Sequence, residues 1–251
     1  MTGRQLILPI LIRWTSPMSI GTWLLTFFIL ISLLYRYSFL STSQRNRFIS
    51  LLPRFVRFKW IENLDLSERR RMLAVIGLPV SVGVGIYTGV LLGAVQSRPF
   101  WNASLVAQLF LFSALSTGCA ALLFALIWER KPLEIGEIRL LYTLDIAALS
   151  LELFIVLPYV IHGQLSVQAV RDSLHLIFGG PFTITFWLFF FGFGLILPLL
   201  MEIREIAPVF LSGSAEYHGK VFAASASIFV LAGGFLLRYI FVYAGQISAF
   251  R

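Results

Sequence analysis

Residues 104–128 read SLVAQLFLFSALSTGCAALLFALIW, twenty-five positions without a charged side chain. A helix needs about 17–25 predominantly apolar residues to cross the roughly 30 Å hydrocarbon core of a bilayer. This stretch is therefore long enough and apolar enough to predict a transmembrane helix.

Five other stretches, before and after this one, meet the same criterion. The six predicted spans are Pro17–Tyr35, Leu73–Val95, Ser104–Trp128, Ile138–Ile161, Phe182–Met201 and Val221–Ala244. We therefore expect an all-α protein, a polytopic transmembrane helix bundle of about six spans. Residues 1–251 form one integral membrane domain in this interpretation, with a basic loop at 36–72.

The composition of the whole sequence excludes an ordinary water-soluble protein. Of its 251 residues, 58% are hydrophobic and only 13% are charged, whereas a soluble domain carries about 25% charged residues. The mean hydropathy of +0.86 is too high for a protein that must cover one core with polar side chains. Membrane lipid is the expected surrounding.

The net charge of +8 is concentrated in one place, and that place favours membrane orientation over nucleic-acid binding. Nine of the twenty Lys and Arg residues lie in 36–72, with no zinc-finger spacing or aromatic-rich groove beside them. Fourteen Lys and Arg residues fall on the side of this loop and five on the opposite side. The positive-inside rule then places the 36–72 loop in the cytoplasm and both termini outside.

Three ionisable side chains lie at membrane depth, where each is costly and so is a candidate for function. Asp145 and Glu152 are seven residues apart in the fourth span, which places them on one helix face about 10 Å apart. They form either a proton relay or structural hydrogen bonds between helices. Arg238, in the last span, either extends outward to the interface or lies inside the bundle, next to Gly233 and Gly234.

The sequence offers few ligands for a metal or a redox centre. Cys119 is the only cysteine, so a cysteine-ligated iron-sulfur cluster has no place within this protein. His162, His175 and His218 fall at span ends or in loops rather than inside the bundle, which argues against bound haem. We expect no metal site here, and any metal redox centre would belong to a partner.

Four stretches of sequence carry a resemblance to a known family. They are Thr15-Ser16-Pro17-Met18-Ser19 with Gly21 and Trp23; Tyr87-Thr88-Gly89-Val90-Leu91-Leu92-Gly93 with Arg98-Pro99-Phe100-Trp101-Asn102; Ser113-Ala114-Leu115-Ser116-Thr117-Gly118; and Gly233-Gly234-Phe235-Leu236-Leu237-Arg238-Tyr239 with Tyr243-Ala244-Gly245-Gln246. Together they resemble the NrfD-type family, the membrane subunit of polysulfide reductase. The resemblance extends over nearly the whole sequence.

The resemblance implies a quinone-binding membrane anchor in the inner membrane of a bacterial or archaeal cell. Such anchors pass electrons between a membrane quinone, menaquinone or ubiquinone, and a ferredoxin-like iron-sulfur subunit. That partner is linked in turn to a molybdopterin enzyme or a multihaem cytochrome. The protein would then be a subunit without metal of a respiratory oxidoreductase complex, with no catalytic residue of its own.

The resemblance also implies a position for the quinone. The tyrosine two residues before the glycine of the second-span motif contacts the quinone in the family, and that position is Tyr87. We expect the pocket in the outer half, between the second and sixth spans, with Arg238 adding positive charge and Trp101 and Asn102 shaping its mouth. Glycines spaced four apart beside Tyr87 indicate either such a ligand site or helix packing alone.

The loop after the second span is the expected docking surface for the iron-sulfur partner. Its residues Arg98, Pro99 and Phe100 lie on the predicted outer side. The family's eight-helix members have two further helices before the Ser-Pro motif, the first supplying an asparagine and a histidine to the quinone pocket. This sequence begins at what resembles the third helix, so we expect that pair from a longer start or another polypeptide.

Two functions from other classes remain open at this stage. One is a proton- or ion-coupled transporter-like bundle, with Asp145, Glu152 and Arg238 along the substrate path. The other is a truncated membrane subunit that takes no part in catalysis.

Overall fold

The computed structural model describes residues 16–41, 43–44, 68–101, 103–128, 135–212 and 220–248. Every element within these ranges is helical. The protein forms two compact units, Met1–Tyr87 and Thr88–Arg251.

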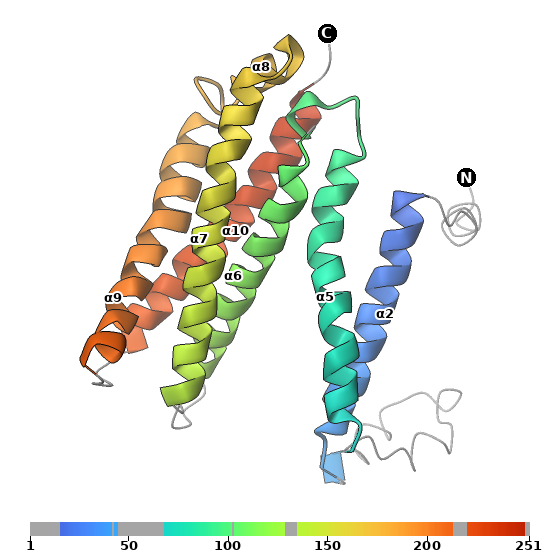
Figure 1. Ribbon diagram of the computed structural model, residues 1–251, viewed down its shortest axis with the longest axis vertical. Helices are drawn as coiled ribbons and strands as arrows, with labels where there is room; N and C mark the ends of the chain where they lie inside the picture. The colour runs from blue at the N-terminus through green and yellow to red at the C-terminus, as the bar shows by residue number, and fades with distance from the viewer. Residues whose placement is uncertain are drawn as a thin grey trace. The chain divides into compact units, whose positions relative to one another are not determined.

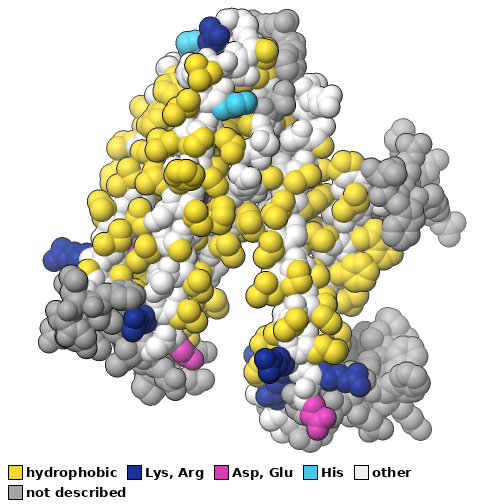
Figure 2. Space-filling view, viewed as in Figure 1, with side chains coloured by type: hydrophobic (Ala, Val, Ile, Leu, Met, Phe, Trp, Pro, Cys, Tyr) yellow, Lys and Arg dark blue, Asp and Glu magenta, His cyan; other side chains and the backbone are white. Residues whose placement is uncertain are grey.

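Within the described residues, six helical spans are long and apolar enough to cross a membrane, as the sequence predicts. They are Pro17–Ser38, Arg70–Gly93, Leu105–Trp128, Gly136–Leu165, Thr185–Pro208 and Lys220–Ile247. On the face that Figure 2 shows, apolar side chains cover much of the surface, and Lys and Arg lie toward its upper and lower ends. An apolar exterior bounded by charged ends is typical of an integral membrane protein.

The first unit is an antiparallel helix pair, α2 (Pro17–Ser38) and the first part of α5 (Arg70–Gly93) (Figure 1). Ser16 precedes α2 as its N-cap, and Pro17 occupies the first turn, where its missing N–H is not needed. At the other end of the pair, the Arg70 guanidinium donates to the Ser38 carbonyl oxygen at 3.0 and 2.6 Å. The loop between the two helices lies largely outside the described residues.

Glycine on α5 lets the two helices of the first unit come close. A Cβ atom at Gly83 would lie 3.2 Å from the Leu24 side chain, and one at Gly77 would lie 3.1 Å from the Ile31 side chain. The bulky side chains of α2 thus pack directly on glycines of α5. Close packing at small residues is how helices associate in a membrane, where no hydrophobic driving force acts between them.

The described residues of the second unit form a bundle of four long helical segments, which Figure 1 shows side by side. They are α6 (Leu105–Trp128), α7 (Ile135–Leu165), η3 (Thr185–Ile196) continued by α9 (Leu197–Ser212), and α10 (Lys220–Ile247). Helix α10 packs on α6, η3 and α9, and α7 packs on α6 and α9. The short elements η2 (Pro99–Trp101) and α8 (Gln168–Leu174) pack together at one end of this bundle.

Backbone meets backbone where η3 crosses α10. A Cβ atom at Gly194 would lie 2.5 Å from the Gly233 Cα, and one at Gly233 would lie equally close to the Gly194 Cα. Neither position accepts a side chain unless the helices move apart. Gly194 and Gly233 are therefore required for this helix contact.

The fifth span differs from its prediction at both ends. It begins after a turn in which Gly179 has φ +129°, a conformation that favours glycine. Its first part, η3, is π-helical, and α9 extends to Ser212. The predicted end at Met201 is wrong because Glu202, Arg204 and Glu205 continue the helix instead of starting a loop.

Candidate functional site

A largely buried polar cluster joins three helices of the second unit. Arg238 of α10 donates from Nη1 to the Gly234 carbonyl oxygen at 2.7 Å and to the Ser113 hydroxyl of α6 at 3.4 Å. The Glu152 carboxyl group of α7, only 3% exposed, contacts the same Ser113 hydroxyl and feels the Arg238 charge. Ser113 therefore bridges an arginine and a glutamate that lie on different helices.

Arg238 points into the bundle. Its guanidinium carbon lies 5.9 Å from the centre of the Phe110 ring, within the range of a cation–π contact. Of the two orientations that the sequence left open, the structure has the inward one, which gives Glu152 a nearby positive charge in a membrane interior.

A second polar pair lies two turns along α7. Asp145 and Glu202, on α7 and α9, are each completely buried, and their carboxyl groups face each other with the Ser116 hydroxyl beside Asp145. Asp145 and Glu152 thus both point into the bundle, as their shared helix face predicts. The structure adds a facing carboxyl group to the first of them.

Glu202 and its neighbour Glu205 are functional candidates that sequence reasoning missed. Both are buried, although the predicted span ends one residue before Glu202. The missed signal is their spacing of three residues in a helix that continues through Pro208, since residues three apart share one helix face.

Tyr87 belongs to the first unit, where its ring packs on α2. The ring occupies the space that a side chain at Gly21 would fill. Its hydroxyl makes no hydrogen bond to any residue that the structure describes. A half-buried phenol in a membrane-spanning helix can donate a hydrogen bond to a ligand.

The loop after α5 is fastened to α10. Trp101 donates from Nε1 to the Phe241 carbonyl oxygen at 2.7 Å, and its indole packs on Gly245. Arg98 donates to the carbonyl oxygens of Gln246 and Ser248 at 2.5 and 2.8 Å. These carbonyl groups lie at the C-terminal end of α10, where a positive charge stabilises the helix.

The predicted docking residues of this loop differ in their accessibility. Pro99 and Phe100 are buried, and Phe100 accepts a hydrogen bond at its carbonyl oxygen from the Tyr159 hydroxyl at 2.8 Å. The side chains of Pro99 and Phe100 therefore stabilise the end of the bundle. Of the three predicted docking residues, Arg98 is the one that is partly exposed. Asn102, predicted at the mouth of the quinone pocket, lies outside the described residues.

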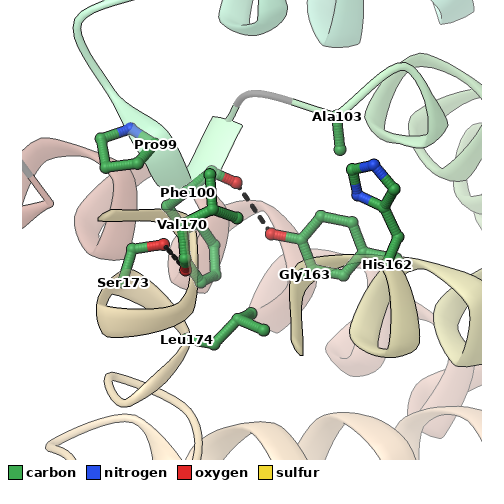
Figure 3. Close-up of a pocket in the computed structure, with 9 residues that line it drawn as sticks. Pro99, Phe100, Ala103, His162, Gly163, Val170, Ser173 and Leu174 are labelled. Carbon is green, nitrogen blue, oxygen red and sulfur yellow. Dashed lines mark hydrogen bonds between the residues drawn. The ribbon is translucent and has the colours of Figure 1, made fainter. Parts of the chain in front are cut away.

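A cavity of about 10 Å³ lies behind this loop, lined by Phe100, Tyr159, His162, Ser173 and Leu174 among others (Figure 3). That volume holds about one water molecule and is too small for a quinone ring. A larger groove of about 320 Å³ between η3 and α10 is lined by Phe189, Phe193, Gly194, Phe229, Ala232 and Leu236. It offers only apolar side chains, so it fits a hydrocarbon tail and cannot bind a polar ring system by hydrogen bonds.

The described residues also show what the site does not contain. Within 16–41, 43–44, 68–101, 103–128, 135–212 and 220–248, no three His, Cys, Asp or Glu side chains gather closely enough to hold a metal ion. The described part of the site does offer Tyr, Ser, Asp, Glu and Arg side chains, which can transfer protons and make hydrogen bonds.

Comparison with known proteins gives a consistent picture. A family described as "Polysulphide reductase, NrfD" matches residues 4–249. Protein NrfD of Escherichia coli is 30% identical over 242 residues, 94% of the present sequence and 71% of the relative. The C polypeptide of polysulfide reductase from Wolinella succinogenes is 29% identical over 181 residues, 70% of the present sequence and 54% of the relative.

A more distant relative comes from another reductase. The C component of selenate reductase from Mesobacillus selenatarsenatis is 28% identical over 134 residues, 52% of the present sequence and 32% of the relative. The matches thus span well under two thirds of the Wolinella and Mesobacillus proteins.

Proposed function

Because this protein belongs to the NrfD family, we propose that it is the subunit through which a reductase complex exchanges electrons with a membrane quinone. It is an integral inner-membrane protein of the kind that serves as a membrane subunit of reductase complexes. What we propose beyond family membership is that this subunit binds a quinone and that its partner is of the kind described below. A bound quinone would supply a redox change that takes up or releases electrons together with protons.

The observation that carries the proposal is the position of the Tyr87 hydroxyl. It is held at membrane depth on α5, against Gly21, without a hydrogen-bond partner among the described residues. A phenol in this setting donates a hydrogen bond to a quinone carbonyl oxygen and stabilises negative charge that develops there. The bond is strong because the surroundings are apolar.

Protons for this chemistry have a candidate route through the second unit. Glu152 and Asp145 are buried on one face of α7, and the Ser113 hydroxyl links Glu152 to Arg238. We assign Glu152 and Asp145 to proton transfer, because carboxyl groups in a bilayer interior are costly and are retained where they act. The guanidinium of Arg238 favours the ionised form of Glu152 after it releases a proton.

The electron partner is proposed to be an iron-sulfur subunit, and through it a molybdopterin or multihaem subunit. The polysulfide and selenate reductase relatives are named as the C components of those reductases, and such a name implies partner subunits. With one cysteine in the whole sequence, the cluster has to be held by another subunit. The end of the bundle near Arg98 is the proposed contact region.

A redox titration of membrane quinol with the purified complex tests the proposal. The quinone pool is expected to equilibrate with the complex only when this subunit is present. A soluble dye that reduces the partner subunits directly is the control, and it should work with or without the membrane subunit. Equal quinone equilibration in both preparations would refute the electron-exchange role and favour a transporter-like or structural bundle.

A further inference from the structure

Asp145 and Glu202 form a pair of buried carboxyl groups, whose oxygen atoms are the subject of this inference. Both side chains are 0% exposed. Their four oxygen atoms have no hydrogen-bond donor in bonding geometry anywhere in the part of the protein that the structure describes. An unpaired ionised carboxylate is one of the most costly groups to bury in a protein interior.

Among the residues that the structure describes, no positive charge is found in contact with the pair. The neighbours that interact with it are Ser116 and Cys119 of α6 and Glu152 of α7. Arg238 lies beside Glu152 instead. Its guanidinium donates hydrogen bonds to the Gly234 carbonyl oxygen and the Ser113 hydroxyl. Two ionised carboxylates in this place would repel each other without a cation to separate them.

We propose that Asp145 and Glu202 bind one proton between them and form a proton-storage site on the route to Glu152. A single proton turns the facing oxygens into a donor and an acceptor, so one hydrogen bond replaces the repulsion. The pair then carries one negative charge, as carboxyl dyads that share a proton do in other proteins.

The position of the pair gives the route a direction. Buried Tyr142 and Glu205 lie one turn beyond it, toward the start of α7 and the end of α9, which are both at the lower end of the bundle in Figure 1. In the opposite direction, beyond Glu152, the core is built from aromatic rings such as Phe100, Phe186 and Phe241. The buried carboxyl groups of the described residues therefore lie between the level of Glu152 and the end of the unit that is predicted to be cytoplasmic.

This inference rests on the proposed function for the use of the proton, but the binding of the proton can be measured without a quinone. Infrared absorption of protonated carboxyl groups is recorded for the purified protein, for Asp145→Asn and for Glu202→Gln. An amide at either position donates to the remaining carboxylate, so each single change is expected to abolish the same band. Glu137→Gln, an exposed position on α7, should leave that band in place.

Two results would contradict the proposal that Asp145 and Glu202 share a proton. A band unchanged in both variants would show that the pair binds no proton. Two separate bands, each lost in one variant only, would show two independent acids.

A second measurement uses the unmodified protein, so it does not depend on the folding of a variant. A hydrophobic carbodiimide adds to a protonated carboxyl group: the proton moves to a carbodiimide nitrogen and the carboxyl oxygen bonds to its central carbon. Mass spectrometry should find the adduct on Asp145 or Glu202, with no more than one per molecule. Absence of the adduct from both residues, with labelling of other buried acids, would contradict the proposal.

These outcomes separate the carboxyl pair from the quinone site. Loss of the pair's proton would leave the quinone affinity of Tyr87 untouched. Failure of quinone binding would leave the infrared band in place.

Discussion

The aromatic ring of Tyr87 lies against the backbone of Gly21, in the space that any side chain at position 21 would need. Gly21 is buried in the first turns of α2, and Tyr87 lies within the membrane-spanning stretch of α5. The glycine thus positions the phenol, and a change at one residue is transmitted to the other.

Gly21→Ala should therefore weaken quinone binding through Tyr87. The added methyl group displaces the ring and breaks the hydrogen bond of its hydroxyl. Loss of such a bond costs about 0.5–1.5 kcal/mol, or roughly two- to tenfold in affinity. Quinone titration of the assembled complex measures the change.

A double-mutant cycle distinguishes positioning from general damage. In a Tyr87→Phe background, Gly21→Ala should have no further effect on affinity, because the hydroxyl is already absent. Gly136→Ala is the control, since a Cβ atom there meets nothing within 4 Å. Additive losses in the cycle would mean that Gly21 acts independently of the Tyr87 hydroxyl.

Glu152→Gln should slow quinone-linked turnover and leave assembly intact. Glutamine preserves the shape and the contact with Ser113 but cannot ionise, so a proton route through this position is interrupted. Turnover is measured with the complex in proteoliposomes, and Glu137→Gln serves as the exposed control on the same helix. Normal turnover in Glu152→Gln would assign this carboxyl group to structure alone.

Gly194→Ala should destabilise the second unit. A methyl group there collides with the Gly233 backbone, and overpacking of this kind typically costs about 1–3 kcal/mol. Gly192→Ala is a matched control two residues away, where the nearest atom to a Cβ lies 3.5 Å off, an ordinary contact. Thermal unfolding in detergent should separate the two variants, and equal melting temperatures would contradict the close approach of η3 and α10.

The orientation in the membrane is tested by cysteine labelling in a Cys119→Ala background. An impermeant reagent is expected to modify Gln164→Cys, at the exposed end of α7, in intact cells. A cysteine at Arg57 should react only after lysis, because the positive-inside rule places the 36–72 loop in the cytoplasm. The reverse pattern would invert the topology and place the carboxyl pair toward the outside.

The spans could be predicted because hydropathy is a local property of the sequence. The exception shows the limit of that reasoning: Glu202, Arg204 and Glu205 look like the start of a loop, yet two of them are buried. Their burial depends on what α7 places opposite them, and Asp145 is 57 positions earlier in the sequence.

The candidate site was predictable only in part for the same reason. The shared face of Asp145 and Glu152 follows from helical spacing alone. The bonds of Arg98 and Trp101, by contrast, join residues 140 or more positions apart. A loop sequence cannot reveal that its arginine and tryptophan fasten the end of a distant helix.

The quinone affinity of Tyr87→Phe in the assembled complex tests the central proposal most directly. Phenylalanine keeps the ring against Gly21 and removes only the hydroxyl, so the affinity should fall roughly two- to tenfold. Tyr35→Phe, an exposed tyrosine at the other end of α2, should keep the original affinity. Unchanged affinity and turnover in Tyr87→Phe would contradict the role of this hydroxyl as a quinone ligand.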